Sequence, residues 1–226
     1  MGITQQIAKL FRLLPWGVAG VGLLLLFVSC SKEETVADEW DNWQQRNAEY
    51  LSYVVNCCQT NTAPALVSKG LGWKRLKAFS KDAAVEGSIT DYVYAYVIEE
   101  GAGTESPAYT DSVRVIYQGR LIPTDSYPEG YVFSSTVYGK FSVETSSTAK
   151  GVASGFIDGF STALQYMHRG DHWRVYIPNE LGYGTSDQTN NGVVTIPGSS
   201  LLVFEIQLVD FSPADQEMPT WKAREK

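Results

Sequence analysis

One stretch of the sequence, residues 156–184, limits the fold more than any other. Its apolar residues recur at the spacing of a short helix: Phe160, Ala163, Leu164 and Met167. Gly170 follows and suits a left-handed turn at the helix end. The run Trp173–Ile177 is aromatic and β-branched, which favours a strand, and Pro178 ends it. We therefore expect a short helix that lies across a sheet and has a pocket beside it.

The rest of the chain supplies the other strands of that sheet. Alternating or β-branched runs predict strands at residues 91–99, 113–121, 131–135, 138–143 and 201–211. Residues 73–79 fit a strand or a helix, whereas residues 146–155 and 185–198 are polar and read as loops. We expect an α+β fold, in which an antiparallel curved sheet of about five strands wraps around one short helix.

The first residues have the pattern of an export signal. Lys9 and Arg12 precede the apolar run 17–28, which is short for a membrane-spanning helix. The run ends at Cys30 in a sequence that resembles a bacterial lipobox, so we expect a signal peptide at 1–29, lipidation of Cys30 and a tether at 30–37. Ser31 resembles an outer-membrane sorting signal, and residues 32–34 fit either a surface-export tag or a solvated tether. An uncleaved anchor with an incidental cysteine is the alternative.

Residues 38–58 predict an amphipathic helix, which Asp38 caps at its start. The apolar stripe runs along one face and comprises Trp40, Trp43, Asn47, Tyr50, Leu51, Val54, Val55 and Cys58. Such a stripe must be buried, either on the main domain or on a second copy of the chain in a homodimer. Cys57 and Cys58 are adjacent and poorly placed to pair with each other. We expect a helical segment and linker at 38–90, a main domain at 91–212 and a polar tail at 213–226.

Charge and histidine content argue against several classes of function. The formal charge is −7, and an acidic protein repels a phosphate backbone, so we expect no nucleic acid partner. The two histidines, His168 and His172, flank Gly170, which argues against a metal site on one helix face. No Gly-x-Ser-x-Gly sequence accompanies them, which argues against serine hydrolase chemistry. We expect no metal and no cofactor.

Six motifs between residues 91 and 211 resemble those of FKBP-type peptidyl-prolyl isomerases, in the order in which the family carries them. They are VRVIYQG at 113–119, FSS at 133–135, FIDGF at 156–160, LQYM at 164–167 with Gly170, YIP and LGYG within 176–184, and IP at 196–197 followed by LVFE at 202–205. The resemblance implies the fold of that family and isomerisation of the bond that precedes proline.

The same resemblance implies which residues form the site. Residues expected to act in catalysis are Tyr117, Phe133, Ile157, Tyr183 and Phe204, and those expected to bind substrate are Ser134, Phe141, Phe156, Phe160 and Ile196. By the same comparison, the Ile157 amide holds the carbonyl before proline, and the Tyr183 hydroxyl holds a second carbonyl.

Two positions depart from the pattern of the family. Ser134 stands where the family has an aspartate, and Phe160 stands where it has a tryptophan. We expect a prolyl isomerase of reduced activity that assists the folding of exported proteins and acts on proline-containing segments. The alternative is a weak or inactive module on a surface lipoprotein, which binds such segments without turning them over.

Overall fold

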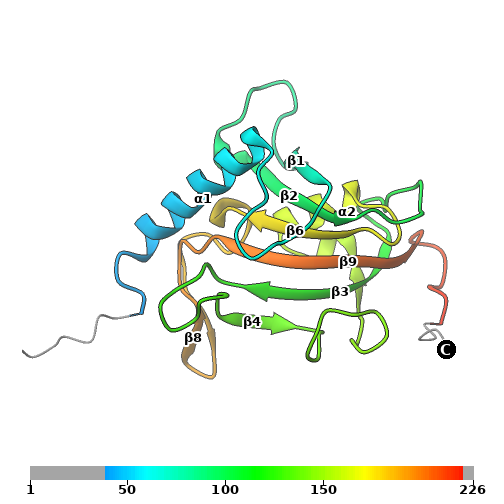
Figure 1. Cartoon of the computed structure of the whole chain (residues 1–226). Coiled ribbons are helices and arrows are strands. Elements are labelled where there is room, and N and C mark those ends of the chain that lie inside the picture. Colours follow the sequence, from blue (N-terminus) through cyan, green and yellow to red (C-terminus); the bar gives the residue numbers. More distant parts are fainter. Residues whose placement is uncertain (1–38, 221–226) are drawn as a thin grey trace, which may run out of the picture. The chain divides into compact units, whose positions relative to one another are not determined.

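The computed structural model describes residues 39–220, which all lie within one compact unit, Ala37–Lys226. Figure 1 shows the elements in sequence colours. The helices are α1 (Trp43–Thr60) and α2 (Asp158–Tyr166), and the 3-10 turns are η1 (Ile89–Asp91), η2 (Ala153–Gly155) and η3 (Asn179–Leu181). The strands are β1 (Gly72–Lys77), β2 (Tyr92–Glu99), β3 (Ser112–Arg120), β4 (Val132–Ser135), β5 (Ala149–Val152), β6 (His172–Ile177), β7 (Gln188–Asn190), β8 (Val193–Ile196) and β9 (Leu202–Ser212).

The main sheet has seven strands, and every pairing in it is antiparallel. Its order is β1-β2-β6-β9-β3-β4, and β5 also pairs with β3. The α+β class is confirmed, but the expected number of about five strands is wrong. The sheet also begins at Gly72, before the predicted domain start at residue 91, because β1 pairs along the whole of its length with β2.

Three segments differ from the expected pattern. Residues 138–143 form no strand, and Gly139 within them has φ +75°, outside the extended region. The polar stretch 146–155 contains β5, and the polar stretch 185–198 contains the separate hairpin β7–β8. These strands lie at edges and bury few side chains, so their sequences lack the apolar alternation that identifies a strand.

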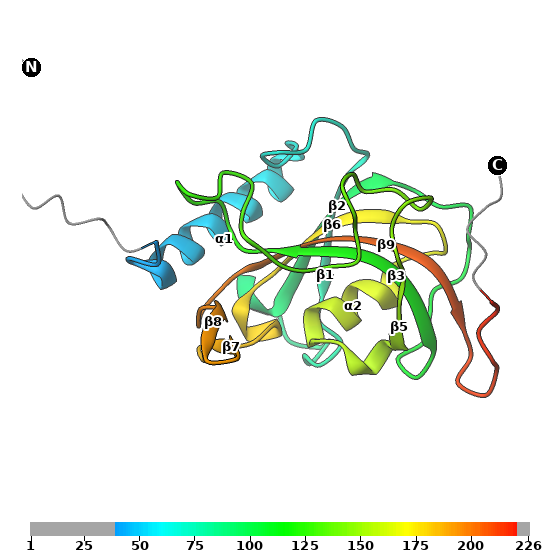
Figure 2. The same ribbon diagram turned by 90° about the horizontal axis from the view of Figure 1, so that it is seen from below.

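Helix α2 covers one face of the sheet, and α1 covers the other, as Figure 2 shows. The predicted stripe of α2 is confirmed, because Phe160, Ala163, Leu164 and Met167 are all buried in the core. The helix ends at Tyr166, and Gly170 lies in the following turn with φ +97°. A Cβ at Gly170 would also stand 2.9 Å from the Gly101 Cα, so this close approach requires glycine.

Strand β9 contributes side chains to both faces of the sheet. Phe204 pairs with Val175 of β6 and with Gly119 of β3, on the face that α2 covers. The neighbouring Val203 pairs with Tyr176 and lies with Tyr50 of α1 around a small cavity on the opposite face. The alternation predicted for residues 201–211 therefore separates a buried face towards α2 from a half-buried face, on which Val203 is buried beside α1.

Helix α1 buries its apolar stripe on the sheet of its own chain. The indole Nε1 of Trp43 donates to Ser200 Oγ (2.8 Å), and the buried Asn47 accepts the Leu201 amide at Oδ1 (2.8 Å). The helix begins at Trp43 rather than at residue 38, after Asn42 in a left-handed conformation without a side-chain cap. The proposed cap, Asp38, lies outside the described residues.

The ends of the chain are described only in part. The predicted signal peptide, Cys30 and the tether lie outside the described residues. Within residues 39–220, no helix has the length and apolarity that crossing a bilayer requires. Part of the predicted polar tail lies against the sheet, because the buried Arg114 donates from Nη2 to the Pro219 carbonyl (2.7 Å). The two described cysteines are free thiols, Cys57 buried and Cys58 half-buried.

Candidate active site

A hollow of about 290 Å³ opens at the amino-terminal end of α2, between that helix and the face of the sheet. Strands β3, β4 and β9, the start of α2 and the loop after η3 supply its walls. The lining residues are Tyr117, Phe133, Ser134, Gly155, Phe156, Ile157, Phe160, Tyr183 and Phe204. The fold thus brings together eight of the ten residues that we expected in the site, although they come from separate parts of the chain.

Two buried phenylalanines form the floor of the hollow. Phe160 is 2% exposed and Phe204 is 4% exposed, and their rings meet edge to face with centroids 5.1 Å apart. Phe156 stacks on Phe160 at 4.8 Å, while Tyr117 meets Phe160 edge to face at 5.9 Å. These offset and edge-to-face arrangements are the favourable ones for aromatic rings, so the floor is a fixed apolar surface.

Gly119 allows two rings to close the side of the hollow. A Cβ at this position would stand 2.6 Å from both the Phe133 ring and the Phe204 ring, which is closer than side chains approach. Phe133 and Phe204 therefore lie over the bare backbone of β3, with their centroids 5.5 Å apart. Neither Gly119 nor Gly155, which lines the hollow at the end of η2, was among the expected site residues. Gly119 ends the VRVIYQG motif, so its position there was the available signal.

The polar edge of the hollow consists of hydroxyl groups. Tyr117 Oη and Ser134 Oγ lie 2.9 Å apart in a hydrogen bond to which either hydroxyl can donate. Burial raises the pKa of the Tyr183 hydroxyl above its usual value, and the nearby Tyr117 adds to the increase. Tyr183 therefore remains protonated, and able to donate, throughout the neutral range. None of the nine lining residues carries a charged side chain, so the hollow has no acid–base pair.

Ile157 is the residue that directly precedes α2, and its carbonyl accepts the Ser161 amide (2.9 Å). The first amide groups of a helix point away from its own hydrogen-bond ladder, and the helix dipole gives this end a partial positive charge. The side chains of Phe156, Ile157 and Phe160 line the hollow, so this end of α2 lies beside it. A carbonyl oxygen of a bound peptide would be stabilised here.

Two expected site residues, Phe141 and Ile196, are not among the residues that line the hollow. Phe141 stacks on His172 with centroids 4.4 Å apart. His172 bonds to Glu205, which points to the face of the sheet opposite Phe204, so Phe141 covers that opposite face. Ile196 does not line the hollow; it is 5% exposed at the end of β8 and packs in the core.

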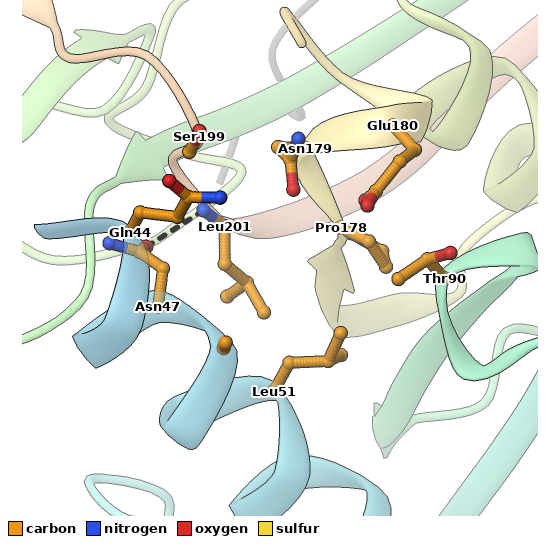
Figure 3. A pocket seen from close by; sticks show the side chains of 10 residues that line it. Gln44, Asn47, Leu51, Thr90, Pro178, Asn179, Glu180, Ser199 and Leu201 are labelled. Atoms are coloured by element: carbon orange, nitrogen blue, oxygen red, sulfur yellow. Dashed lines mark hydrogen bonds between the residues drawn. The ribbon is translucent and has the colours of Figure 1, made fainter. Parts of the chain in front are cut away.

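A second and smaller hollow of about 130 Å³ lies between α1 and the loop after β6. Figure 3 labels residues that line it. Asn47 and Leu51 of α1 face Pro178 and Leu201 across it. The Oδ1 atom of Asn47 accepts the Leu201 amide, and its Nδ2 donates to the Trp43 carbonyl. Both polar groups of Asn47 therefore have partners within the protein. The aromatic hollow is the better candidate site because its rings surround a larger and uncharged space.

The fold and the site define a class of protein: an α+β domain whose pocket is aromatic and uncharged. Residues 103–209 match a family model described as FKBP-type peptidyl-prolyl cis-trans isomerase. Residues 103–209 are thus similar to an FKBP-type peptidyl-prolyl cis-trans isomerase domain. Strands β1 and β2 and helix α1 precede the matched residues.

The chain is also similar to curated proteins of this kind. It is 33% identical over 136 residues to FkpA of Escherichia coli, covering 60% of this chain and 43% of that protein. It is 39% identical over 114 residues to the FKBP-type 22 kDa isomerase of E. coli, covering 50% and 47%. Outer membrane protein MIP of Legionella longbeachae is 31% identical over 118 residues, covering 52% and 43%.

The similarities cover only part of each relative, and the chain spans less than half the length of these three proteins. A crystal structure of a peptidyl-prolyl cis-trans isomerase from Pseudomonas syringae is 23% identical, with a TM-score of 0.48. The match covers 74% of this chain and 96% of that one.

Proposed function

We propose that the protein is a peptidyl-prolyl cis-trans isomerase that assists the folding of exported proteins. The observation that carries the proposal is the uncharged aromatic hollow, in which eight of the ten expected residues meet. A proline ring fits such a surface through apolar contact, and the FKBP-type domain over residues 103–209 supports the same reaction.

The reaction needs no nucleophile. Rotation about an X-Pro bond has a barrier of about 20 kcal/mol, because amide resonance holds the bond planar. The planar amide is more polar than the twisted one, so a dry aromatic surface solvates the twisted state relatively better. Each difference of about 1.4 kcal/mol between the two states gives a tenfold change in rate.

Two donors would hold the twisted geometry. In the proposed mechanism, the Ile157 amide at the start of α2 holds the carbonyl before proline, and the Tyr183 hydroxyl holds a second carbonyl. The helix dipole favours the developing charge on the first oxygen. The raised pKa of Tyr183 keeps the second donor protonated at neutral pH. No cofactor takes part in this mechanism.

The second candidate is a weak or inactive module that grips proline-containing segments. Two observations favour it. The Tyr117–Ser134 hydrogen bond is neutral, whereas the aspartate that the family carries at this position would make it charge-assisted. Phe160 also provides a smaller floor than the tryptophan of the family. These features predict slower turnover while leaving the apolar binding surface intact.

A protease-coupled assay with a short X-Pro peptide tests the proposal. The protein at micromolar concentration should raise the rate above the uncatalysed rate, and Tyr183→Arg, which places a charge at the mouth, should abolish that increase. Tyr138→Arg is the matched control, because Tyr138 is 71% exposed and does not line the hollow. Peptide binding without any rate increase would establish the binding module instead.

We further propose that the protein is an outer-membrane lipoprotein anchored through lipid on Cys30, facing the periplasm or the cell surface. The support is the lipobox-like end of the export signal, together with a relative whose name places it in the outer membrane. Cys30→Ser should move the protein from the membrane fraction to the soluble fraction. Protease treatment of intact cells distinguishes the two orientations.

Pairing of two chains through residues 38–58 remains a prediction. The apolar stripe of α1 is already buried on its own sheet, so a dimer would have to use the opposite face of the helix. Measurement of the mass in solution over a range of concentrations tests this, and a constant monomer mass contradicts it.

A further inference from the structure

A groove that differs from both hollows described above lies on the outer side of α2, away from the sheet. It has a volume of about 290 Å³. Its lining residues are Phe79, Ser80, Tyr109, Asp158, Ser161 and Gln165. Phe79 is 54% exposed and Tyr109 is 57% exposed, so the groove presents two large rings to solvent. Exposed rings that line one groove offer apolar surface to a binding partner.

The Phe79 ring of this groove is held in place. The Phe79 amide donates to Thr162 Oγ1 of α2 (3.4 Å), and the hydroxyl of the next residue, Ser80, bonds to the Asp158 carboxylate. The Phe79 ring stacks on Tyr166 of α2, with centroids 5.0 Å apart and planes 18° apart. A partner would therefore meet an ordered Phe79 ring and would lose little affinity to its ordering.

The groove adjoins the aromatic hollow through one short segment. Gly155, Phe156 and Ile157 line the hollow, and the next residue, Asp158, lines the groove. On the same side, the Tyr109 carbonyl accepts the amide of Ser154, the residue before Gly155. The stretch 154–158 thus separates the two sites, and consecutive residues lie about 3.8 Å apart. A chain bound in the hollow needs to cross only this wall to reach the groove.

The chemistry of the groove indicates what occupies it. Its lining residues include two large aromatic rings and one carboxylate, and none of them is basic. Such a surface favours an apolar side chain, and the Asp158 carboxylate favours a neighbouring lysine or arginine.

We propose that the groove is a second subsite for the same polypeptide whose X-Pro bond enters the hollow, and that it takes an apolar residue a few positions away from the proline. This inference rests on the proposed function. It gives the protein a preference for long unfolded chains over short peptides, because only a long chain reaches both sites.

The test compares peptides that reach one site or both. The long probe is a peptide of roughly 12 residues, which extends to about 40 Å, with one X-Pro bond and one phenylalanine placed at increasing distances on either side. The best placement should bind about tenfold more tightly than the same peptide with serine at that position. Phe79→Ala and Tyr109→Ala should each remove most of that gain, while turnover of a short X-Pro peptide stays unchanged.

Tyr127→Ala is the matched control. Tyr127 is 41% exposed, meets the ring of Tyr131 edge to face and lines neither the hollow nor the groove. It should therefore keep the full gain. The two groove variants alter side chains that are more than half exposed, so folding should persist, which circular dichroism checks.

Each other outcome overturns a definite statement. If the wild-type protein turns over no short peptide, the proposed isomerase function fails, while binding of the long peptide still reports on the groove. If the phenylalanine gives no gain, or the variants keep it, the subsite is absent. Equal losses with the short peptide would place the effect in the hollow itself. A change in mass in solution without a change in peptide affinity would make the surface a contact between copies.

Discussion

At the scale of single residues, the pair of hydroxyls at the edge of the hollow deserves the first test. Tyr117 and Ser134 lie 2.9 Å apart, and neither carries a charge. A carboxylate in place of the Ser134 hydroxyl would accept a charge-assisted hydrogen bond from the Tyr117 hydroxyl. Such a bond is roughly twice as strong as one between neutral groups. Ser134 therefore sets the polarity of this edge.

We predict that Ser134→Asp raises kcat/KM for a short X-Pro peptide by about fivefold, equivalent to roughly 1 kcal/mol of transition-state stabilisation. The coupled peptide assay measures this. Ser134→Asn introduces a side chain of the same size as aspartate but without its charge. This variant should leave the rate near that of the wild type. A fall in rate for Ser134→Asp would show that the cost of placing a carboxylate beside the rings is the larger effect.

The sequence located most of the site because its residues stand in recognisable motifs. Tyr117, Phe133, Ile157, Tyr183 and Phe204 all reach the hollow as expected. Phe141 does not, because its position depends on how a loop without regular structure crosses the sheet, and no periodicity encodes that path. Ile196 was assigned from the motif at 196–197, but the packing of the β7–β8 hairpin turns its side chain into the core.

At the level of secondary-structure elements, the sequence did not reveal which surface helix α1 packs against. The stripe of α1 was visible as a pattern, but its partner surface was not, because burial on the same chain and on a second copy produce the same periodicity. The structure places Asn47 in the contact, where it joins α1 to Leu201, the residue before β9. A buried asparagine between two elements fixes how they align.

We predict that Asn47→Ala lowers the free energy of unfolding by roughly 1–3 kcal/mol, because the buried Leu201 amide loses its acceptor. Urea unfolding followed by fluorescence measures the change. Gln44→Ala is the control, because Gln44 is exposed and lies about one turn before Asn47 on α1. It should change the free energy of unfolding by less than about 0.5 kcal/mol. An Asn47→Ala protein as stable as the Gln44→Ala protein would mean that α1 is not anchored here.

Polar edge strands were the elements that the sequence could not supply. Strand β5 pairs only with β3, and the β7–β8 hairpin pairs only within itself. Their backbone hydrogen bonds form without burial of an apolar face, so the residues carry little signal. By contrast, β9 buries every second residue from Leu202 to Leu208 against a half-buried opposite face, and this alternation was plain in the sequence.

At the scale of the whole molecule, the layer between α1 and the sheet is rich in tyrosine hydroxyls that are kept from water. Burial raises the pKa of Tyr50 to about 12, and burial also raises the pKa of Tyr94 and of Tyr176. A raised pKa in the folded state means that the folded protein holds these protons more tightly than the unfolded chain does. Stability from this source is therefore complete below about pH 10 and is lost as the pH rises towards 12.

We predict that the free energy of unfolding falls between about pH 9 and pH 11, and that Tyr50→Phe reduces this fall by about 1 kcal/mol. Urea titrations at the two pH values measure the difference for each protein. Tyr138→Phe removes a hydroxyl that is exposed, so it should show the same fall as the wild type. An unchanged fall in Tyr50→Phe would exclude Tyr50 as a source of alkaline instability.

The alternation of β9 has a consequence for how this chain tolerates changes in length. Val203 and Phe204 are neighbours, yet one faces the α1 layer and the other forms the floor of the hollow. One inserted residue before Val203 would exchange the two sets of side chains between the faces, leaving Glu205 and Gln207 to face α2. We therefore expect that β9 does not tolerate insertions or deletions, whereas the exposed turn between β7 and β8 tolerates them.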